Sequence, residues 1–421
     1  MTLSKFSYNY FILLFSVIPI TFLTGSAALL SNIILLDLSF LILIIYNKDY
    51  LFLKSKPIKY LLILYIYLIF NSFISIDFSF SYSRNFGFIR LIILFAAFNY
   101  FFLNEKFYKK VISFWLIIIL IVSIDVLIEQ FTGTNIFGYN FGERFFTGEG
   151  PFKNRIEFGR IVSFFKDEPI VGGYLLGFFF ILVGFLFNEL KDKKQLFGFA
   201  FLIFILFIII LTGERSNSIR AFLGFGLFIL FFNKLELKIK IISLLSVVVL
   251  IFVMVINNTY LKIRFISNIK SMSSTHKVYF HIYNSSIQVF ENNKIFGVGN
   301  KNYRVETCRK SNSVNKKNKE KYKCQNHPHQ IYLELLSEHG ILGSFLIIFV
   351  LFKLIFSKII ETFKKDNFLK QGSLIYLILM FVPLLPSGAF FGSFLLTIFM
   401  INLSIFYASD RDYNIFIKKN Y

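Results

Sequence analysis

Residues 327–343, HPHQIYLELLSEHGILG, place several titratable side chains next to an apolar run. An unperturbed imidazole titrates near neutral pH, so His329 is a candidate for proton transfer. One helical stripe, at about 100° per residue, would hold His329, Leu333, Leu336, Gly340 and Gly343. Pro328 suits the start of such a helix. The simpler interpretation of His329 is a hydrogen-bonding residue at that helix start, and the stretch alone leaves both open.

The remaining residues of this stretch have simpler expectations. Its two glycines either let a neighbouring helix approach closely or mark a bend from an interfacial helix into a membrane span. Glu334 and Glu338 lie one turn apart, and we expect them on the other side of the helix, facing headgroups or a loop. His327 is a weaker candidate for a functional role.

Two arginines lie in other polar segments, Arg160 in residues 160–174 and Arg215 in residues 213–220. A guanidinium group stays charged and offers fork geometry to phosphate oxygens, so both are candidates for gripping a diphosphate. The alternative is that they snorkel to lipid headgroups. Glu214 next to Arg215, and Asp167 with Glu168 near Lys166, would form ion pairs that orient these basic groups.

The composition indicates that these polar segments belong to a membrane protein. Of 421 residues, 56% are hydrophobic and 16% charged, and the apolar runs are long enough to cross a bilayer core. The composition predicts an all-α polytopic membrane protein, a bundle of about twelve transmembrane helices with one large periplasmic loop. The first run lacks a convincing cleavage signature and is predicted to be a helix, not a signal peptide. The predicted spans lie near residues 8–23, 27–46, 60–74, 89–102, 111–128, 170–187, 197–211, 219–232, 239–256, 341–356, 374–386 and 394–407.

The distribution of lysines predicts how these helices are oriented across the membrane. With a cytoplasmic N-terminus every inside loop is rich in lysine, whereas the short outside connections near 75–83 and 387–393 have no Lys or Arg. Both termini are therefore predicted to be cytoplasmic. The net charge of +21 is explained by these loops, and no groove-reading motif supports nucleic-acid binding.

The predicted organisation has three parts. Residues 1–256 carry about nine spans, residues 257–340 form the large periplasmic loop, and residues 341–421 carry the last spans and a cytoplasmic tail. In the loop, Gly297 and Gly299 predict a turn and nothing more. The only two cysteines, Cys308 and Cys324, flank a lysine- and asparagine-rich run that is typical of a solvated loop. In an oxidising compartment they are expected to form a disulfide at the loop base, with two free thiols as the alternative.

Several of these segments resemble the O-antigen polymerase and O-antigen ligase family of bacterial inner-membrane glycosyltransferases. The ligase pattern of His, then Asn, Ser or Gln, nine residues, Gly, two residues and Gly is met by His329, Gln330, Gly340 and Gly343. Further short motifs occur in the family's order: Gln130 to Gly133, Arg160 to Glu168, Thr212 to Arg215, and Phe296 to Gly299. The resemblance covers roughly residues 84–345; each motif is short, and only their order and shared side of the membrane are specific.

The resemblance implies a reaction. An acceptor sugar hydroxyl attacks the anomeric carbon of a glycan on undecaprenyl diphosphate, and the lipid diphosphate leaves without a metal or other cofactor. On this view His329 is the general base or orients the acceptor, and Arg215 and Arg160 hold the diphosphate. The expected location is the bacterial inner membrane. Supporting candidates are Glu214, His327, Gln330, Arg90 and Arg304, and the expected partners are the lipid-linked oligosaccharide, membrane lipids and a regulator of chain length.

Alternatives remain at two levels. Within the family, a polymerase joins repeat units, a ligase passes finished glycan to lipid A core, and the run of motifs only slightly favours a polymerase; a protein O-glycosylating enzyme is a third candidate. From another class, a transporter or flippase would place charges near the bilayer middle in matched halves. The main intramembrane charges are Asp37 and Asp125, and no paired halves are evident.

Overall fold

The structure is a computed structural model that describes residues 5–140, 160–166, 168–190, 195–233, 235–267, 275–312 and 322–417. Asp167, which the sequence suggested as an ion-pair partner, lies outside the described residues. So does most of the lysine-rich run between the two cysteines.

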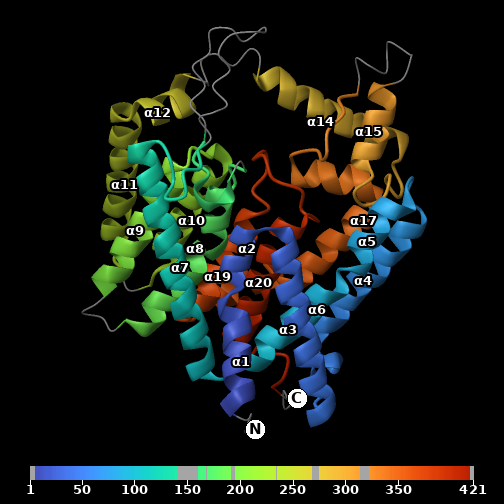
Figure 1. Cartoon of the computed structure of the whole chain (residues 1–421), viewed down its shortest axis with the longest axis horizontal. Helices are drawn as coiled ribbons and strands as arrows, with labels where there is room; N and C mark the ends of the chain where they lie inside the picture. The colour runs from blue at the N-terminus through green and yellow to red at the C-terminus, as the bar shows by residue number, and fades with distance from the viewer. Residues whose placement is uncertain are drawn as a thin grey trace. The chain divides into compact units, whose positions relative to one another are not determined.

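Helices dominate the structure, and the described residues contain no strand (Figure 1). Five described helices are long and apolar enough to cross a membrane, or six if the pair at the N-terminus, bent by 43°, counts as one span. The chain is therefore an integral membrane protein with several apolar helices. Each predicted apolar run falls at least partly on a helix, and the count of about twelve spans stays a prediction. The span predicted near 374–386 was misplaced, since its helix runs from Phe368 to Leu379.

The chain divides into two compact units, each assembled from three separate segments. Unit 1 comprises Met1–Leu36, Asn104–Ser271 and Phe363–Leu379. Its helices are α1 (Lys5–Ser16), α2 (Ile18–Thr24), the first half of α3 (Ser26–Asn47), α7 (Glu105–Thr132), α8 (Val171–Glu189), α9 (Gln195–Leu211), α10 (Arg215–Phe231), α11 (Leu237–Asn257), α12 (Thr259–Lys262) and α19 (Phe368–Leu379), with short turns η3 (Ser163–Phe165) and η5 (Ile263–Ser267).

The core of unit 1 is the apolar helix α8, which packs closely against α19 (Figure 1). Glycines allow this contact, because a Cβ atom on Gly184 would lie 2.2 Å from the carbonyl oxygen of Phe368. A Cβ on Gly372 would lie 1.9 Å from the carbonyl oxygen of Phe180. The small residues therefore bring two backbones together, as is common between helices in membranes.

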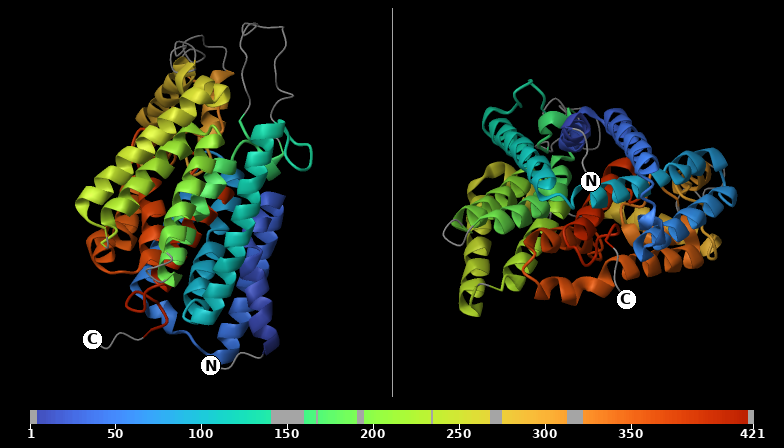
Figure 2. Two further views of the ribbon diagram at one scale, coloured as in Figure 1. Left: turned by 90° about the vertical axis from the view of Figure 1, so that its left-hand side faces the viewer. Right: turned by 90° about the horizontal axis from the view of Figure 1, so that it is seen from below.

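Unit 2 comprises Asp37–Leu103, Met272–Thr362 and Met380–Tyr421. Helix α17, orange in Figure 2, follows α15 in the sequence and precedes the C-terminal part of the chain. It packs against α4 and α14, while α6 packs against α20. The helices of unit 2 are the second half of α3, α4 (Lys56–Phe73), α5 (Phe78–Phe86), α6 (Ile89–Phe101), α14 (Thr275–Asn292), α15 (Tyr303–Ser311), α17 (Ile331–Leu354) and α20 (Ser393–Ala408), with turns η1 (Leu51–Lys54) and η6 (Phe356–Lys358); α18 (Ile359–Lys364) lies at the unit boundary.

Candidate functional site

Helix α17 begins at Ile331, not at Pro328 as the sequence suggested. Gln330 caps it, because its side-chain oxygen accepts a hydrogen bond from the Leu333 N–H at 2.7 Å. His329 precedes the cap in a left-handed conformation with φ of 56°. The predicted helical stripe headed by His329 was therefore wrong: this residue belongs to the connection before the helix, which aims its side chain independently of the helical period.

Gly340 breaks α17 with φ of 63° and ψ of −167°, a conformation open to glycine. Of the two roles expected for the glycines, both are present. Gly340 makes the bend, and Gly343 allows close approach, because a Cβ atom there would lie 1.7 Å from the Tyr67 hydroxyl oxygen of α4. A break inside a helix leaves backbone groups without intrahelical partners, and these need other partners when buried.

The loop at residues 294–299 supplies those partners. The N–H groups of Val298 and Gly299 donate to the carbonyl oxygens of Ser337 and Glu338 at 3.0 and 2.9 Å. In return, Ile341 and Leu342 on α17 donate to the loop carbonyls of Lys294 and Ile295, at 2.8 and 3.2 Å. The Phe-Gly-Val-Gly sequence is thus more than the turn that was expected, because it completes the hydrogen bonding of the broken helix.

Glu334 and Glu338 are each only 2% exposed, so of the two surroundings expected from the sequence, headgroups or a loop, they face loops. Each carboxylate accepts backbone hydrogen bonds from a different loop. Glu334 accepts from the N–H groups of Phe390 and Phe391, at 2.9 and 3.4 Å. Glu338 accepts from the N–H groups of Lys301 and Tyr303, at 2.9 and 3.3 Å. The two acidic side chains therefore fasten two loops to one helix.

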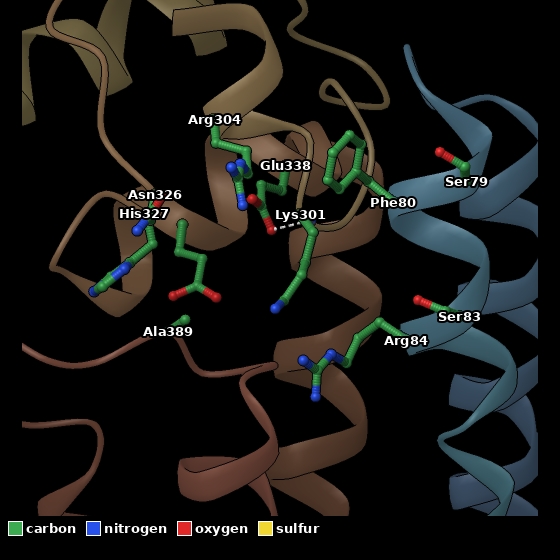
Figure 3. Close-up of a pocket in the computed structure, with 11 residues that line it drawn as sticks. Ser79, Phe80, Ser83, Arg84, Lys301, Arg304, Asn326, His327, Glu338 and Ala389 are labelled. Atoms are coloured by element: carbon green, nitrogen blue, oxygen red, sulfur yellow. Dashed lines mark hydrogen bonds between the residues drawn. The ribbon is translucent and has the colours of Figure 1, made fainter. Parts of the chain in front are cut away.

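These loops and α5 enclose a pocket of about 320 Å³ (Figure 3). Three cationic side chains, those of Arg84, Lys301 and Arg304, point into it from different elements, and both carboxylates lie on its wall. With all five groups ionised, positive charges exceed negative ones by one. The remaining lining residues are Ser79, Phe80, Ser83, Asn326, His327 and Ala389.

Lys301 interacts electrostatically with the other charged groups of this pocket. Burial and the positive charge of Arg84 lower the pKa of Lys301, and the carboxylates of Glu338 and Glu334 oppose this shift. Arg84 donates to the Ser393 hydroxyl oxygen at 2.5 Å, and the Arg304 guanidinium lies 5.3 Å from the centre of the Phe80 ring. The cations are therefore held in place by contacts that leave further N–H donors for a ligand.

Buried amides hold α5 and the 299–302 loop together. The Asn300 backbone N–H donates to the side-chain oxygen of Asn71 at 2.7 Å, and its side chain donates to that of Asn85 at 2.5 Å. Asn302 donates to the hydroxyl of Ser81 at 2.8 Å and accepts from the N–H of Asp77 at 2.7 Å. Buried amides without partners would be costly, so this network specifies where Arg84 and Lys301 meet.

The two histidines lie at the edge of this pocket. The rings of His327 and His329 have centroids 4.0 Å apart, and His327 lines the pocket. Burial and the charge of His329 lower the pKa of His327 to about 4, and burial lowers the pKa of His329. The backbone carbonyl of His329 accepts from the Ser387 N–H at 2.9 Å, and its ring stands edge-on to Tyr279. Both imidazoles are therefore neutral near pH 7 and able to accept a proton.

The other predicted candidates lie elsewhere, beginning with the cysteines. Cys308 and Cys324 form a disulfide with sulfurs 1.97 Å apart, which ties α15, the helix of Arg304, to the segment leading to the histidines. Arg90 lies on α6, where its charge is close to that of Asp37, and it does not line the pocket.

Arg160, Glu214 and Arg215 belong to unit 1. The Glu214 carboxylate accepts from the N–H of Gly172 and the side-chain amide of Asn217, both at 2.6 Å. Burial raises the pKa of Glu214, and the charge of Arg160 opposes the rise. Arg215 is half-buried and begins α10 directly after Glu214. Glu214 therefore interacts electrostatically with Arg160, whereas the sequence had suggested its neighbour Arg215 as the partner.

Sequence reasoning missed Arg84 and Lys301 as site residues. Lys301 follows the Phe-Gly-Val-Gly turn closely in the sequence, and Arg84 directly follows a predicted outside connection. Their concentration at one predicted face was an available signal. The proximity of Arg84 and Lys301 depends on the buried amides of Asn71 and Asn85, and no short sequence motif identifies these amides.

A comparison with known protein families matches the part of the chain that contains several of the pocket residues. No curated protein is significantly similar to the chain. The pocket residues Lys301, Arg304, Glu334 and Glu338, together with both histidines, fall within residues 199–348, a region that matches a family model. That model is described as O-Antigen ligase, and this match supports the resemblance of the chain to the O-antigen polymerase and ligase family.

Proposed function

We propose that this protein transfers or polymerises a glycan from an undecaprenyl-diphosphate-linked donor onto an acceptor sugar hydroxyl, at the periplasmic side of the bacterial inner membrane. The observation that carries the proposal is that two neutral histidines lie beside a cationic pocket, and that both histidines, Lys301 and Arg304 belong to the matched region. The family supports a glycosyltransferase-like activity. It does not support the transporter alternative.

His329 serves as the general base. Its imidazole takes the proton of the acceptor hydroxyl as the oxygen forms a bond to the anomeric carbon. The bond from that carbon to the phosphate oxygen breaks, and the lipid diphosphate leaves with the electron pair. Protein charges near the leaving group stabilise the growing negative charge, and no metal is needed for this balance.

Two groups of cations can hold phosphate. In unit 2, Arg84 and Arg304 offer fork-shaped donors around Lys301. In unit 1, Arg160 and Arg215 remain the diphosphate ligands proposed from the sequence.

A ligase is the second candidate, favoured by the description of the matched family model as O-Antigen ligase. The products separate the two in cells. After deletion of the gene, a lipid A core that carries a single repeat unit indicates a polymerase. A bare core with normal polymer left on the lipid carrier indicates a ligase.

Transfer from purified lipid-linked donor tests the shared chemistry. His329→Ala should lower turnover on the order of a hundredfold or more, because proton transfer contributes about that much. His281→Ala is the control, since His281 lies on α14 and does not line the pocket. Equal turnover by wild type and His329→Ala at matched protein levels would remove His329 from the chemistry.

A further inference from the structure

The pocket beside the histidines brings together positive charges that form no ion pair among the described residues. In Figure 3 the Lys301 ammonium group points towards the Arg84 guanidinium, and the charge of Arg84 contributes to the lowered pKa of Lys301. The carboxylates of the wall attract Lys301 only from a longer distance than an ion pair. Like charges that converge in a partly buried space gain stability from an anion between them. The pocket is therefore suited to a negatively charged group of a ligand.

The charge balance of this pocket indicates which kind of anion fits it. With its three cations and two carboxylates ionised, the lining has a net charge of one positive unit. A single carboxylate on a ligand would balance that charge. A diphosphate ester carries more than one negative charge and would also meet the two carboxylates on the wall, and such like-charge contacts cost energy. The pocket therefore matches a singly charged group better than a diphosphate.

His327 adds a requirement that a phosphate does not meet. Its ring makes a hydrogen bond to the backbone of Ser387 that opposes the lowering of its pKa, as a contact in which the ring donates does. The Nε2 atom of the ring is buried and has no hydrogen-bond partner among the described residues. In a neutral imidazole that donates through Nδ1, Nε2 is an acceptor. A diphosphate ester offers only acceptor oxygens, whereas a hydroxyl group can donate to Nε2.

The size and the neutral groups of the pocket suit one sugar residue. Its volume of about 320 Å³ lies at the lower end of the range for small-molecule sites, which begins at about 300 Å³. The lining includes the Ser83 hydroxyl and the Asn326 side-chain amide, and both groups donate and accept hydrogen bonds. These groups match the hydroxyls of a sugar, and the cations match a negative charge on the same ligand.

We propose that this pocket binds an acidic sugar of the glycan, a residue that carries a carboxylate beside its ring hydroxyls. The carboxylate lies among the three cations, and a ring hydroxyl donates to Nε2 of His327. The inference rests on the proposed function for the statement that this sugar belongs to the transferred glycan. It adds the substrate class, a glycan that contains an acidic sugar, and it leaves the diphosphate to Arg160 and Arg215.

The experiment measures binding to the full chain by ligand-detected NMR, in a detergent without a sugar headgroup and without lipid-linked donor. The probes are methyl glucuronide, methyl glucoside, which lacks the carboxylate, and inorganic pyrophosphate. Methyl glucuronide should bind at least about tenfold more tightly than methyl glucoside, because a hydrogen bond to a charged group contributes about that much. Pyrophosphate should bind more weakly than the glucuronide, because it brings more negative charge to the wall carboxylates and cannot donate to His327. Since no transfer is measured, failure of this binding and failure of the proposed transfer are separate results.

Three variants assign the contacts. Lys301→Gln should weaken binding of methyl glucuronide about tenfold and change that of methyl glucoside less than about twofold. His327→Ala should weaken binding of both sugars to a similar extent, about fivefold, because it removes an acceptor for a hydroxyl that both carry. The matched control is Lys294→Gln, which removes an exposed lysine of the neighbouring loop that does not line the pocket. The control should change the binding of either sugar less than about twofold.

Three results would overturn the proposal. Equal affinity for the glucuronide and the glucoside would show that the cations do not contact a sugar carboxylate. Tighter binding of pyrophosphate than of the glucuronide, lost in Lys301→Gln, would assign the pocket to the diphosphate of the donor. Equal losses of glucuronide binding in Lys301→Gln and Lys294→Gln would show only general attraction to a basic surface. If Lys301→Gln does not fold, the comparison of the three probes on the wild-type protein still decides.

Discussion

The carboxylate of Glu338 accepts a hydrogen bond from the backbone N–H of Lys301 at 2.9 Å (Figure 3). This contact joins the helix that follows His329 to the loop that carries the central cation of the pocket. It holds Lys301 in a left-handed conformation, with φ of 63°. The position of a charged side chain in the site thus depends on an acidic residue that touches only its backbone.

Glu338→Gln should therefore loosen the 299–303 loop. A glutamine side chain keeps one acceptor oxygen, but its NH₂ group is a donor and cannot accept a hydrogen bond. One of the two backbone N–H groups, that of Lys301 or that of Tyr303, therefore loses its partner. The expected loss of stability is about 1–3 kcal/mol. It is measured as a lower melting temperature in detergent, with Glu291→Gln on the exposed face of α14 as the control. An unchanged melting temperature would contradict this role.

Gly340→Ala should destabilise the protein more than the same substitution at a glycine inside a regular helix. A Cβ atom at Gly340 would lie 2.4 Å from backbone atoms of Ile295, and its φ of 63° is unfavourable for alanine. Gly226→Ala in α10 is the control, because its Cβ would meet only Leu244 at 3.8 Å. Folded yield and melting temperature should fall for Gly340→Ala only, and equal behaviour of both variants would contradict the strained break.

Arginine-to-lysine substitutions separate phosphate binding from anchoring. If Arg215 only snorkels to headgroups, Arg215→Lys keeps charge and stem and should be nearly silent. If it grips a diphosphate, lysine lacks the fork and turnover should drop clearly while the protein still folds. Arg84→Lys makes the same test in the unit 2 pocket. Near wild-type transfer by both variants would refute arginine fork binding at these positions.

Combining the substitutions tests for shared action. If Arg215 and His329 stabilise one transition state, the variant with both Arg215→Lys and His329→Ala should lose less than the product of the two single losses. The measurement is again transfer from purified donor. Fully multiplicative losses would indicate independent contributions.

The pH dependence of turnover follows from the buried imidazole and ammonium groups. A general base works unprotonated, so turnover should rise with pH through the pKa of His329, and burial moves this rise below the ordinary value for histidine. If the charge of Lys301 aids catalysis, turnover should fall again at alkaline pH, below the ordinary lysine pKa. In His329→Ala the acidic rise should disappear from the residual activity, and its persistence would assign the base elsewhere.

The disulfide should resist alkylation. Cys308 and Cys324 should stay unmodified in intact cells until reductant is added, and quantitative alkylation without reductant would contradict the bond. Replacing both cysteines by serine should cost about 3 kcal/mol, the usual contribution of a cross-link that closes a loop of this length. Melting with and without reductant measures it, and the serine variant should be insensitive to reductant.

Local patterns in the sequence were enough for the membrane class, because long apolar runs can satisfy their backbone only as helices in lipid. They also marked residues 327–343 and the pairing of Cys308 with Cys324. The His, Gln and two-glycine spacing indicated the family that the match at 199–348 supports. Such features depend on composition and short spacing, which the chain carries directly.

Tertiary structure alone decided the rest. Periodicity placed His329 at the head of a helical stripe, because it assumes an unbroken helix from that residue. The helix instead begins at Ile331, and the break at Gly340 is completed by hydrogen bonds from a distant loop. Arg84 reaches Lys301 across more than two hundred residues of chain through buried amides. A contact of that sequence separation is selected by packing and hydrogen-bond satisfaction in three dimensions, which no local pattern encodes.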